Sequence, residues 1–205
     1  MTTERQIHTK VTRQDWIDAA LASLEHEAID QLRVLTLART LDVSRSSFYW
    51  YFESPAELQA ELMNIWERNT TSIVERTERD TADITAACLG VFECWADATL
   101  YSPAVELSVR DWARRDASVA GSVAQADLDR LAALTAMFEA HQFEPADATV
   151  RARLLYHSQI GYYALGTDEP MATRLEYLPY YLEAMTGQRP SASALSAFAQ
   201  LVSSL

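Results

Sequence analysis

The sequence has 205 residues, of which 49% are hydrophobic, so it is long enough to bury a sizeable core. Only 5 residues are glycine and 6 are proline, a composition that favours long helices over a turn-rich β fold. No run of about 18 apolar residues is present and the N-terminus is polar, which argues against a membrane span and a signal peptide. We therefore expect a cytoplasmic, all-α protein.

The formal net charge of −12 at first sight opposes binding to nucleic acid, because DNA affinity comes largely from neutralised phosphates. The distribution of charge weakens this objection, since residues 1–50 hold six basic residues against seven acidic ones. A basic face forms there if the basic side chains converge on one side. The candidates for such a face are Arg5, Lys10, Arg13, Arg33 and Arg45.

The first predicted helix runs from about Arg13 to Ala28. Thr12 is in the N-cap position and Asp15 follows three residues later, which is the spacing of a capping box. The inward stripe of this helix is expected to contain Trp16, Ala20, Leu21 and Leu24.

Residues 33–52 are predicted to form two short helices around a tight turn, a shape that fits a DNA major groove. Asp42 lies at the turn, where a positive φ is needed and Asp is tolerated at modest cost. Ser44 is expected to cap the second helix by accepting a hydrogen bond from the backbone N–H of Ser46 or Ser47. The apolar stripe of the first helix consists of Val34, Leu37, Ala38 and Leu41.

On the second helix, Phe48 and Phe52 are expected to pack back against the first. Tyr49 and Trp50 are adjacent and cannot both face one core, so at least one large ring should be exposed. The remaining side chains are mostly donors, hydroxyls and flat rings, which suit phosphate and base-edge contacts. The exposed set is Arg45, Ser46, Ser47, Tyr49, Trp50 and Tyr51.

Residues 54–57, Ser-Pro-Ala-Glu, form the clearest helix start in the chain, because Ser caps, Pro occupies the first helical position and Glu reaches back. This helix is expected to continue to about Arg79. No strand is predicted after it, and the short coil segments are typical of packed antiparallel helices. The further predicted helices cover about residues 82–100, 103–114, 118–141, 145–166, 170–185 and 191–205. On the first of these, Cys88 and Cys94 point in different directions, so buried reduced thiols are favoured over a disulfide or a redox sensor.

The segments 18–21, 37–38, 43–52 and 54–58 together resemble the DNA-binding domain of tetracycline-repressor-like (TetR) transcriptional regulators. The resemblance covers about the first third of the chain. It implies a homeodomain-like three-helix, helix-turn-helix (HTH) DNA-binding domain in residues 1–53. It also implies a helical ligand-binding and dimerisation domain in residues 54–205, and a location in the bacterial cytosol and nucleoid.

In the family, positions that match the start of the first motif helix and the second helix touch DNA. The resemblance therefore implies contacts by Arg33 and Thr36, and Arg45 is the best candidate for reading a base. The full predicted DNA-binding set is Arg33, Thr36, Ser44, Arg45, Ser46, Ser47, Tyr49, Trp50 and Tyr51.

The resemblance also implies a small-molecule pocket between the helices of the C-terminal domain, where aromatic rings line a ligand and polar groups orient it. Plain core packing is the alternative for each aromatic residue. The predicted ligand-binding set is Phe92, Trp95, Trp112, Phe138, Tyr156, His157 and Gln159, with Glu106 as a further polar candidate.

These features predict a homodimeric repressor that a small molecule releases from a palindromic DNA operator, with half-sites about one helical turn apart. The resemblance implies that the dimer is built from residues 147–166 and 170–187. The apolar rows expected to form this contact contain Leu154, Leu155, Leu175, Leu178 and Leu182.

The main alternative is a small-molecule-binding or protein-interaction module with weak or lost DNA binding. The acidic balance favours it, as do Glu53 and Pro55, near which the family usually has basic residues. An enzyme with a buried carboxylate is a weaker alternative. The four histidines lie far apart and no phosphate-binding Gly loop or nucleophile elbow occurs, so we expect no catalytic residue, metal or cofactor.

Overall fold

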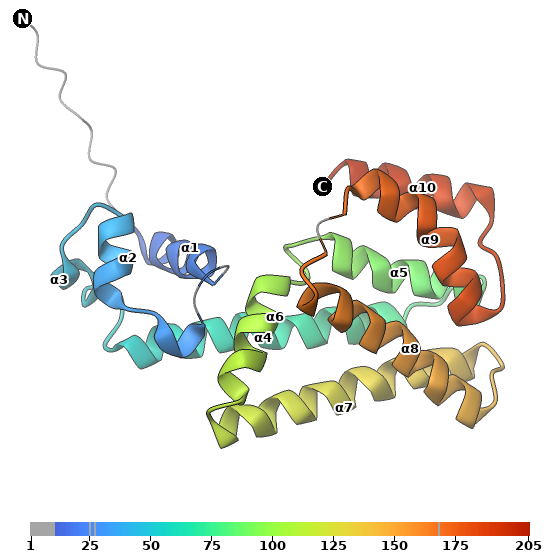
Figure 1. The fold of residues 1–205 in the computed structure, drawn as a ribbon, viewed down its shortest axis with the longest axis horizontal. Helices are drawn as coiled ribbons and strands as arrows, with labels where there is room; N and C mark the ends of the chain where they lie inside the picture. The colour runs from blue at the N-terminus through green and yellow to red at the C-terminus, as the bar shows by residue number, and fades with distance from the viewer. Residues whose placement is uncertain (1–10, 25, 27, 168) are drawn as a thin grey trace, which may run out of the picture. The chain divides into compact units, whose positions relative to one another are not determined.

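The computed structural model describes residues 11–24, 26, 28–167 and 169–205, and the regular structure of these residues is entirely helical (Figure 1). The all-α prediction is confirmed. None of the helices in this part of the chain is both long and apolar enough to cross a membrane. The chain divides into two compact units, residues 1–64 and 65–205, which are described one at a time. The division into a DNA-binding domain, residues 1–53, and a ligand-binding and dimerisation domain, residues 54–205, stays a prediction.

In the residues that the structure describes, the N-terminal unit contains three short α-helices, one 3₁₀ helix and the first part of a long α-helix. Its elements are α1 (Arg13–Ser23), the 3₁₀ helix η1 (Ile29–Gln31), α2 (Val34–Thr40), α3 (Arg45–Phe48) and the beginning of α4 (Pro55–Thr77).

Helix α1 begins with the predicted capping box. The Thr12 hydroxyl accepts from the backbone N–H of Asp15 at 3.2 Å, and the Asp15 carboxylate accepts from the backbone N–H of Thr12 at 2.6 Å. The predicted end at Ala28 was wrong, because the helix ends at Ser23. This early end allows η1 to bring Ile29 into the core, where it is fully buried.

Three aromatic rings form the centre of the N-terminal core. Trp16 of α1 packs edge-on against Phe48 of α3 at 5.2 Å between ring centroids, and Phe48 stacks on Phe52 at 5.0 Å. The predicted inward packing of both phenylalanines is confirmed. Two residues of the predicted stripes, Leu21 and Leu41, are only partly buried.

The turn of the HTH motif has the predicted backbone but not the predicted cap. Asp42 has a φ of 53°, in the left-handed region. Ser44 is the N-cap of α3, yet its hydroxyl forms no bond with the backbone N–H groups of Ser46 or Ser47. It bonds instead to their hydroxyls, at 2.8 and 3.1 Å, because all three short side chains stand together at the start of a single helical turn.

Helix α4 begins as predicted at Ser54. The Ser54 hydroxyl accepts from the backbone N–H of Glu57 at 3.4 Å. The Glu57 carboxylate accepts from the backbone N–H of Glu53 at 2.6 Å, one residue before the donor of an ordinary capping box.

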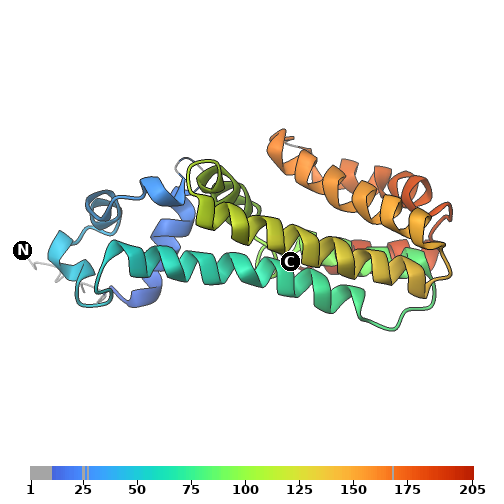
Figure 2. The ribbon, with the colours of Figure 1, turned by 90° about the horizontal axis from the view of Figure 1, so that it is seen from below.

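The C-terminal unit contains the remainder of α4 and six further helices, whose ends lie within a few residues of the predicted positions. These helices are α5 (Ile84–Ala96), α6 (Pro103–Ala113), α7 (Ala117–Ala140), α8 (Pro145–Ala164), α9 (Met171–Thr186) and α10 (Ala192–Ser203). Helix α8 packs on α7, and α5 lies inside the unit between α7 on one side and α9 and α10 on the other (Figures 1 and 2).

The core of this unit includes both cysteines of α5. Cys88 and Cys94 are free and fully buried, and burial raises the pKa of each thiol to about 12. The prediction of reduced, buried thiols is confirmed. At physiological pH both remain protonated and therefore poorly nucleophilic.

The leucines predicted to form the dimer contact lie mostly in this core. Leu155 and Leu182 have no exposed surface, Leu178 is buried and Leu175 packs against the core, so this part of the prediction was wrong. The row is apolar because it fills the space between α8, α9 and α5. Leu154, at 53% exposure, is the exposed member.

Candidate DNA interface and ligand pocket

The surface of α3 and the turn that follows it presents the ring-and-hydroxyl set that the sequence predicts. Trp50 is 77% exposed and Tyr49 is 45% exposed, whereas Phe48 between α3 and the core is fully buried. Arg45, Ser44 and Ser46 are exposed, and Ser47 is partly buried. The short helix therefore fixes Phe48 inward and turns the neighbouring rings to the outside.

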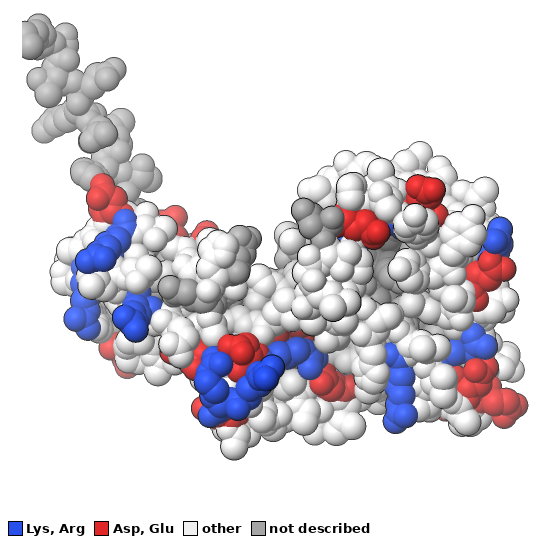
Figure 3. Space-filling model, in the orientation of Figure 1, with Lys and Arg blue, Asp and Glu red and all other residues white. Residues whose placement is uncertain are grey.

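The arginines of the N-terminal unit differ in whether a carboxylate neutralises their charge. The Arg13 guanidinium lies over the Phe52 ring and pairs with Glu61 at 3.3 Å and with Glu57 at 3.7 Å. Arg33 and Arg45 are exposed, and neither forms an ion pair with any residue that the structure describes. Figure 3 shows Arg side chains standing out on the visible face of this unit, beside α2 and α3.

The other predicted DNA-binding residues differ in exposure and in their hydrogen bonds. Arg33 is the N-cap of α2, and Thr36 in the first turn of that helix is exposed. Tyr51 is partly buried, because its hydroxyl donates to the backbone carbonyl of Val11, and its ring is therefore fixed against the chain that enters α1. The Arg45 guanidinium donates to the Tyr49 hydroxyl at 3.4 Å. Arg5 and Lys10 lie outside the described residues.

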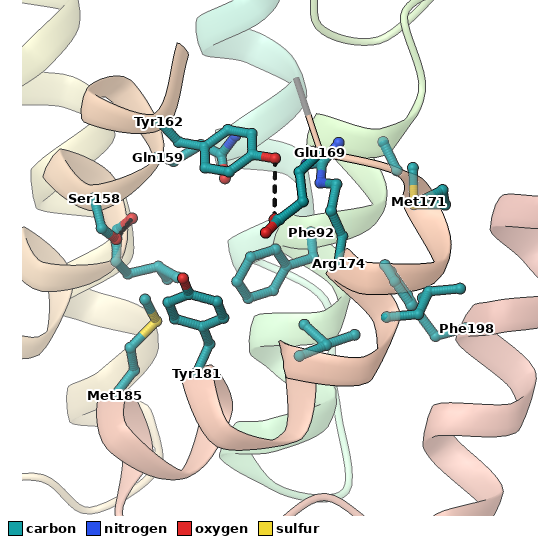
Figure 4. A pocket seen from close by; sticks show the side chains of 14 residues that line it. Phe92, Ser158, Gln159, Tyr162, Glu169, Met171, Arg174, Tyr181, Met185 and Phe198 are labelled. Carbon is teal, nitrogen blue, oxygen red and sulfur yellow. Dashed lines mark hydrogen bonds between the residues drawn. The ribbon is translucent and has the colours of Figure 1, made fainter. Parts of the chain in front are cut away.

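A pocket opens between α5, α8, α9 and α10 in the C-terminal unit (Figure 4). Its volume is about 770 Å³, in which the open solvent at the mouth is included. Most of its wall is aliphatic, aromatic or thioether. The lining residues are Phe92, Ala96, Leu155, Ser158, Gln159, Tyr162, Glu169, Met171, Arg174, Leu175, Leu178, Tyr181, Met185 and Phe198.

Two kinds of polar group interrupt this apolar wall. Gln159 of α8 is only 7% exposed, and its side-chain N–H₂ forms no hydrogen bond of ordinary length. The Gln159 side chain does lie beside the Tyr163 hydroxyl: burial raises the pKa of Tyr163, and Gln159 partly offsets that rise. Near the mouth, the Tyr162 hydroxyl donates to Glu169 at 3.3 Å, and the Arg174 guanidinium lies over the Tyr162 ring at 5.0 Å from its centroid.

The pocket brings together Phe92 and Gln159 from the predicted ligand set. Trp95 and Phe138 lie in the core, and Trp112 is a partly buried residue of α6. His157 is exposed and faces a shallow hollow beside Leu154.

Sequence reasoning missed the remaining lining residues. The spacing of Leu155, Gln159 and Tyr162 places them on one face of α8 and was the available signal.

Glu106 and Tyr156 belong to a buried ionic network rather than to the pocket. Glu106 of α6 and Arg130 of α7 have fully buried side chains and form two hydrogen bonds of 2.8 and 3.1 Å. The Tyr156 hydroxyl of α8 accepts from Arg130 and from Arg110, each at 2.8 Å, and donates to Asp127 at 2.6 Å.

The same network holds the second part of α4. The indole N–H of Trp66 donates to Glu106 at 2.9 Å, and the Asn69 side-chain amide donates to the same carboxylate oxygen at 3.3 Å. Arg130 donates to the Thr70 hydroxyl at 3.0 Å. Four helices are therefore joined through one buried carboxylate and one buried guanidinium.

The charges of this network determine the pKa of Glu106. Burial alone raises it, but the adjacent Arg130 and Arg110 guanidinium groups outweigh burial and keep the pKa of Glu106 below its ordinary value of 4.5. The pKa of Asp127 is also lowered, because hydrogen bonds from Arg110 and Tyr156 outweigh its burial.

Residues 17–62 match the sequence profile of the family described as bacterial regulatory proteins, tetR family. The profile match, which is confined to this N-terminal segment, supports a TetR family regulator. This match covers α1, the HTH motif and the start of α4, so the predicted resemblance is confirmed. A TetR family member is a DNA-binding transcriptional regulator. A comparison with curated proteins found no match for this chain.

Two solved structures share the TetR fold over nearly the whole chain. GusR from Salmonella enterica is 17% identical, with a TM-score of 0.53, and the match covers 94% of each chain. A proposed transcriptional regulator from Pseudomonas aeruginosa PAO1 is 13% identical, with a TM-score of 0.56, and the match covers 94% of this chain and 98% of the other. At these identities the likeness shows the fold alone.

Replacing Glu106 with Gln should lower the free energy of unfolding by about 3–5 kcal/mol, because the Arg130 cation is left buried without its carboxylate. The measurement is urea unfolding followed by circular dichroism. The matched control is Asp111→Asn, which breaks an exposed pair with Arg115 of 2.9 Å and should cost less than about 1 kcal/mol. If both variants lose the same free energy of unfolding, the buried pair contributes no more to stability than an exposed one.

The same network predicts the pH dependence of stability. Because the folded pKa of Glu106 is lowered, its contribution is complete above the ordinary value of 4.5 and is lost as the pH falls through the lower folded value. Urea midpoints should therefore decrease below about pH 4.5, and this decrease should be shallower in Glu106→Gln.

Proposed function

We propose that this regulator is a repressor that binds a palindromic operator through the exposed surface of α3 and leaves it when a small molecule binds. The observation that supports the proposal is the outward-facing set of Arg45, Tyr49 and Trp50 beside a buried Phe48. Large exposed rings beside a guanidinium that has no ion-pair partner among the described residues are unusual on a protein surface that binds nothing.

Each exposed group has a role in this proposal. The Arg45 fork matches the O6 and N7 acceptors of guanine, and the Ser46 and Ser47 hydroxyls suit base edges or phosphate. At the start of α2, Arg33 and Thr36 contact the phosphate backbone of the DNA. Ser44, Tyr49, Trp50 and Tyr51 complete the proposed contact set, with Tyr51 acting mainly by fixing the chain before α1 through its bond to Val11.

Replacing Arg45 with Ala should weaken binding to a duplex selected from random DNA by roughly 5- to 150-fold, since one good base contact contributes about 1–3 kcal/mol. Binding to unrelated DNA should change much less. The measurement is fluorescence anisotropy at several salt concentrations.

The matched control for that experiment is Arg114→Ala, which removes the same charge from the exposed C-cap of α6. An equal loss in both variants would mean that Arg45 supplies only net charge. If no duplex is selected at all, the alternative of a binding module with weak or lost DNA affinity replaces the repressor proposal.

We propose further that two copies associate through the exposed faces of α8 and α9. Val150 and Leu154 are 54% and 53% exposed on α8, and Tyr180 is 59% exposed on α9. Regulators of the TetR family usually dimerise. A two-fold pair presents two α3 helices to two half-sites of a palindrome, which a single copy cannot do.

Replacing Leu154 with Glu should shift the protein from dimer to monomer in sedimentation equilibrium, because it places two carboxylates against an apolar interface. Leu128→Glu is the control, since Leu128 of α7 is 62% exposed and lies outside the proposed contact. If Leu154→Glu stays dimeric, or both variants dissociate alike, α8 does not form the interface.

We propose that the effector binds in this pocket. We propose also that a movement of α8 then alters the contacts of the buried network with α4. Leu155 and Gln159 of α8 line the pocket, while Tyr156 between them bonds to Arg130 of the buried network. A ligand that displaces α8 therefore changes the hydrogen bonds of Arg130, which also holds Thr70 of α4. The two sites are coupled only if the ligand prefers one arrangement of this network.

Replacing Tyr156 with Phe should reduce the factor by which an effector weakens operator binding, because the three hydroxyl-mediated bonds between α8 and the network are lost. Effectors are found by thermal-shift screening, and both affinities are then titrated with and without the other ligand. Tyr177→Phe on α9, whose ring is exposed, is the control. Independent effector and operator binding in the unaltered protein would eliminate the switch while leaving DNA binding intact.

A further inference from the structure

The side-chain amide of Gln159 is the least satisfied polar group of the pocket wall. Gln159 is 7% exposed and lines the pocket, and its N–H₂ group forms no hydrogen bond of ordinary length, although the Tyr163 hydroxyl lies beside it. A buried donor without a partner costs about 1–3 kcal/mol relative to one that is hydrogen-bonded. A bound molecule that supplies an acceptor atom at this position recovers that free energy, so the amide selects for an acceptor.

The surrounding wall selects for an apolar body. Phe92 of α5, Tyr181 of α9 and Phe198 of α10 contribute rings from three different helices (Figure 4). Leu155 and Met185 add aliphatic and thioether surface to the wall. Pockets of this composition bind ligands chiefly by removing apolar surface from water. The adaptable thioethers of Met171 and Met185 allow the wall to fit more than one ring shape.

The charged residues of the pocket do not favour a charged ligand. Glu169 and Arg174 carry opposite charges, and both contact Tyr162, one through its hydroxyl at 3.3 Å and the other over its ring at 5.0 Å. An anion attracted by Arg174 is repelled by Glu169, and a cation meets the reverse situation. An uncharged ligand avoids both penalties.

We infer that this pocket takes a small, uncharged, largely apolar molecule whose carbonyl-type oxygen accepts a hydrogen bond from the Gln159 amide. This rests on the proposed function, because it names the chemical class of the effector. Ketones, esters, lactones and amides belong to this class. Hydrocarbons lack the acceptor, and carboxylates bring a charge that the pocket does not balance.

Three probes of similar shape separate these possibilities in calorimetric titrations of the full chain. Acetophenone carries the acceptor, ethylbenzene has nearly the same shape without it, and benzoate carries a negative charge. We expect acetophenone to bind roughly tenfold more tightly than ethylbenzene, which is the effect of one hydrogen bond to an otherwise unsatisfied donor. Benzoate should bind more weakly than acetophenone.

Replacing Gln159 with Met should abolish the preference for acetophenone over ethylbenzene, because the volume is nearly kept while the donor is removed. The variant should fold, since it replaces an unpaired buried amide with an apolar group. Gln200→Met makes the same change at an exposed position of α10 outside the pocket and should keep the preference.

Each other result overturns the inference. Equal affinity for acetophenone and ethylbenzene means that Gln159 meets only water, and tighter binding of benzoate means that Arg174 selects an anion. A preference that survives in Gln159→Met places the carbonyl elsewhere. Failure of acetophenone to bind at millimolar concentration excludes this class, whereas operator binding and its response to other compounds would still stand.

Discussion

The buried ion pair between Glu106 and Arg130 constrains the arrangement of the C-terminal unit more than any single apolar contact. Both side chains have no exposed surface, so each must recover its lost hydration through short bonds with correct geometry. Trp66, Asn69 and Tyr156 supply several of these bonds from α4 and α8. Apolar surfaces tolerate sliding by a fraction of a turn, but this network is satisfied in only one register of the four helices.

Helix α8 is the element that both the network and the pocket share. Consecutive positions on a helix are separated by about 100°, so Tyr156 reaches the ionic network while Leu155 and Gln159 line the pocket. The network resists displacement of α8 because movement breaks charge-assisted bonds around two fully buried side chains, Glu106 and Arg130. Such an element has few intermediate positions, which is the property that a two-state response requires.

The helix starts could largely be predicted from sequence because they depend on local chemistry, whereas the end of α1 could not. The capping box at Thr12 and the Ser-Pro start at Ser102 involve residues three apart or fewer, so the sequence contains the complete signal. The partner of a polar side chain depends instead on how helices pack. Glu106 was expected to orient a ligand, but it pairs with Arg130, which is 24 positions away and on another helix. Tyr162 and Arg174 were missed in the pocket for the same reason.

The net negative charge of the whole chain differs from the local charge on the surface of α3. Arg13 pairs with Glu57 and Glu61, so its positive charge is already balanced by carboxylates of α4. Arg33 and Arg45 have no such acidic partner among the described residues. Phosphates respond to the charges within about one Debye length, roughly 8–10 Å, rather than to the net charge of −12. The sequence contains the number of charges, but only the pairing within the fold determines which of them remain free.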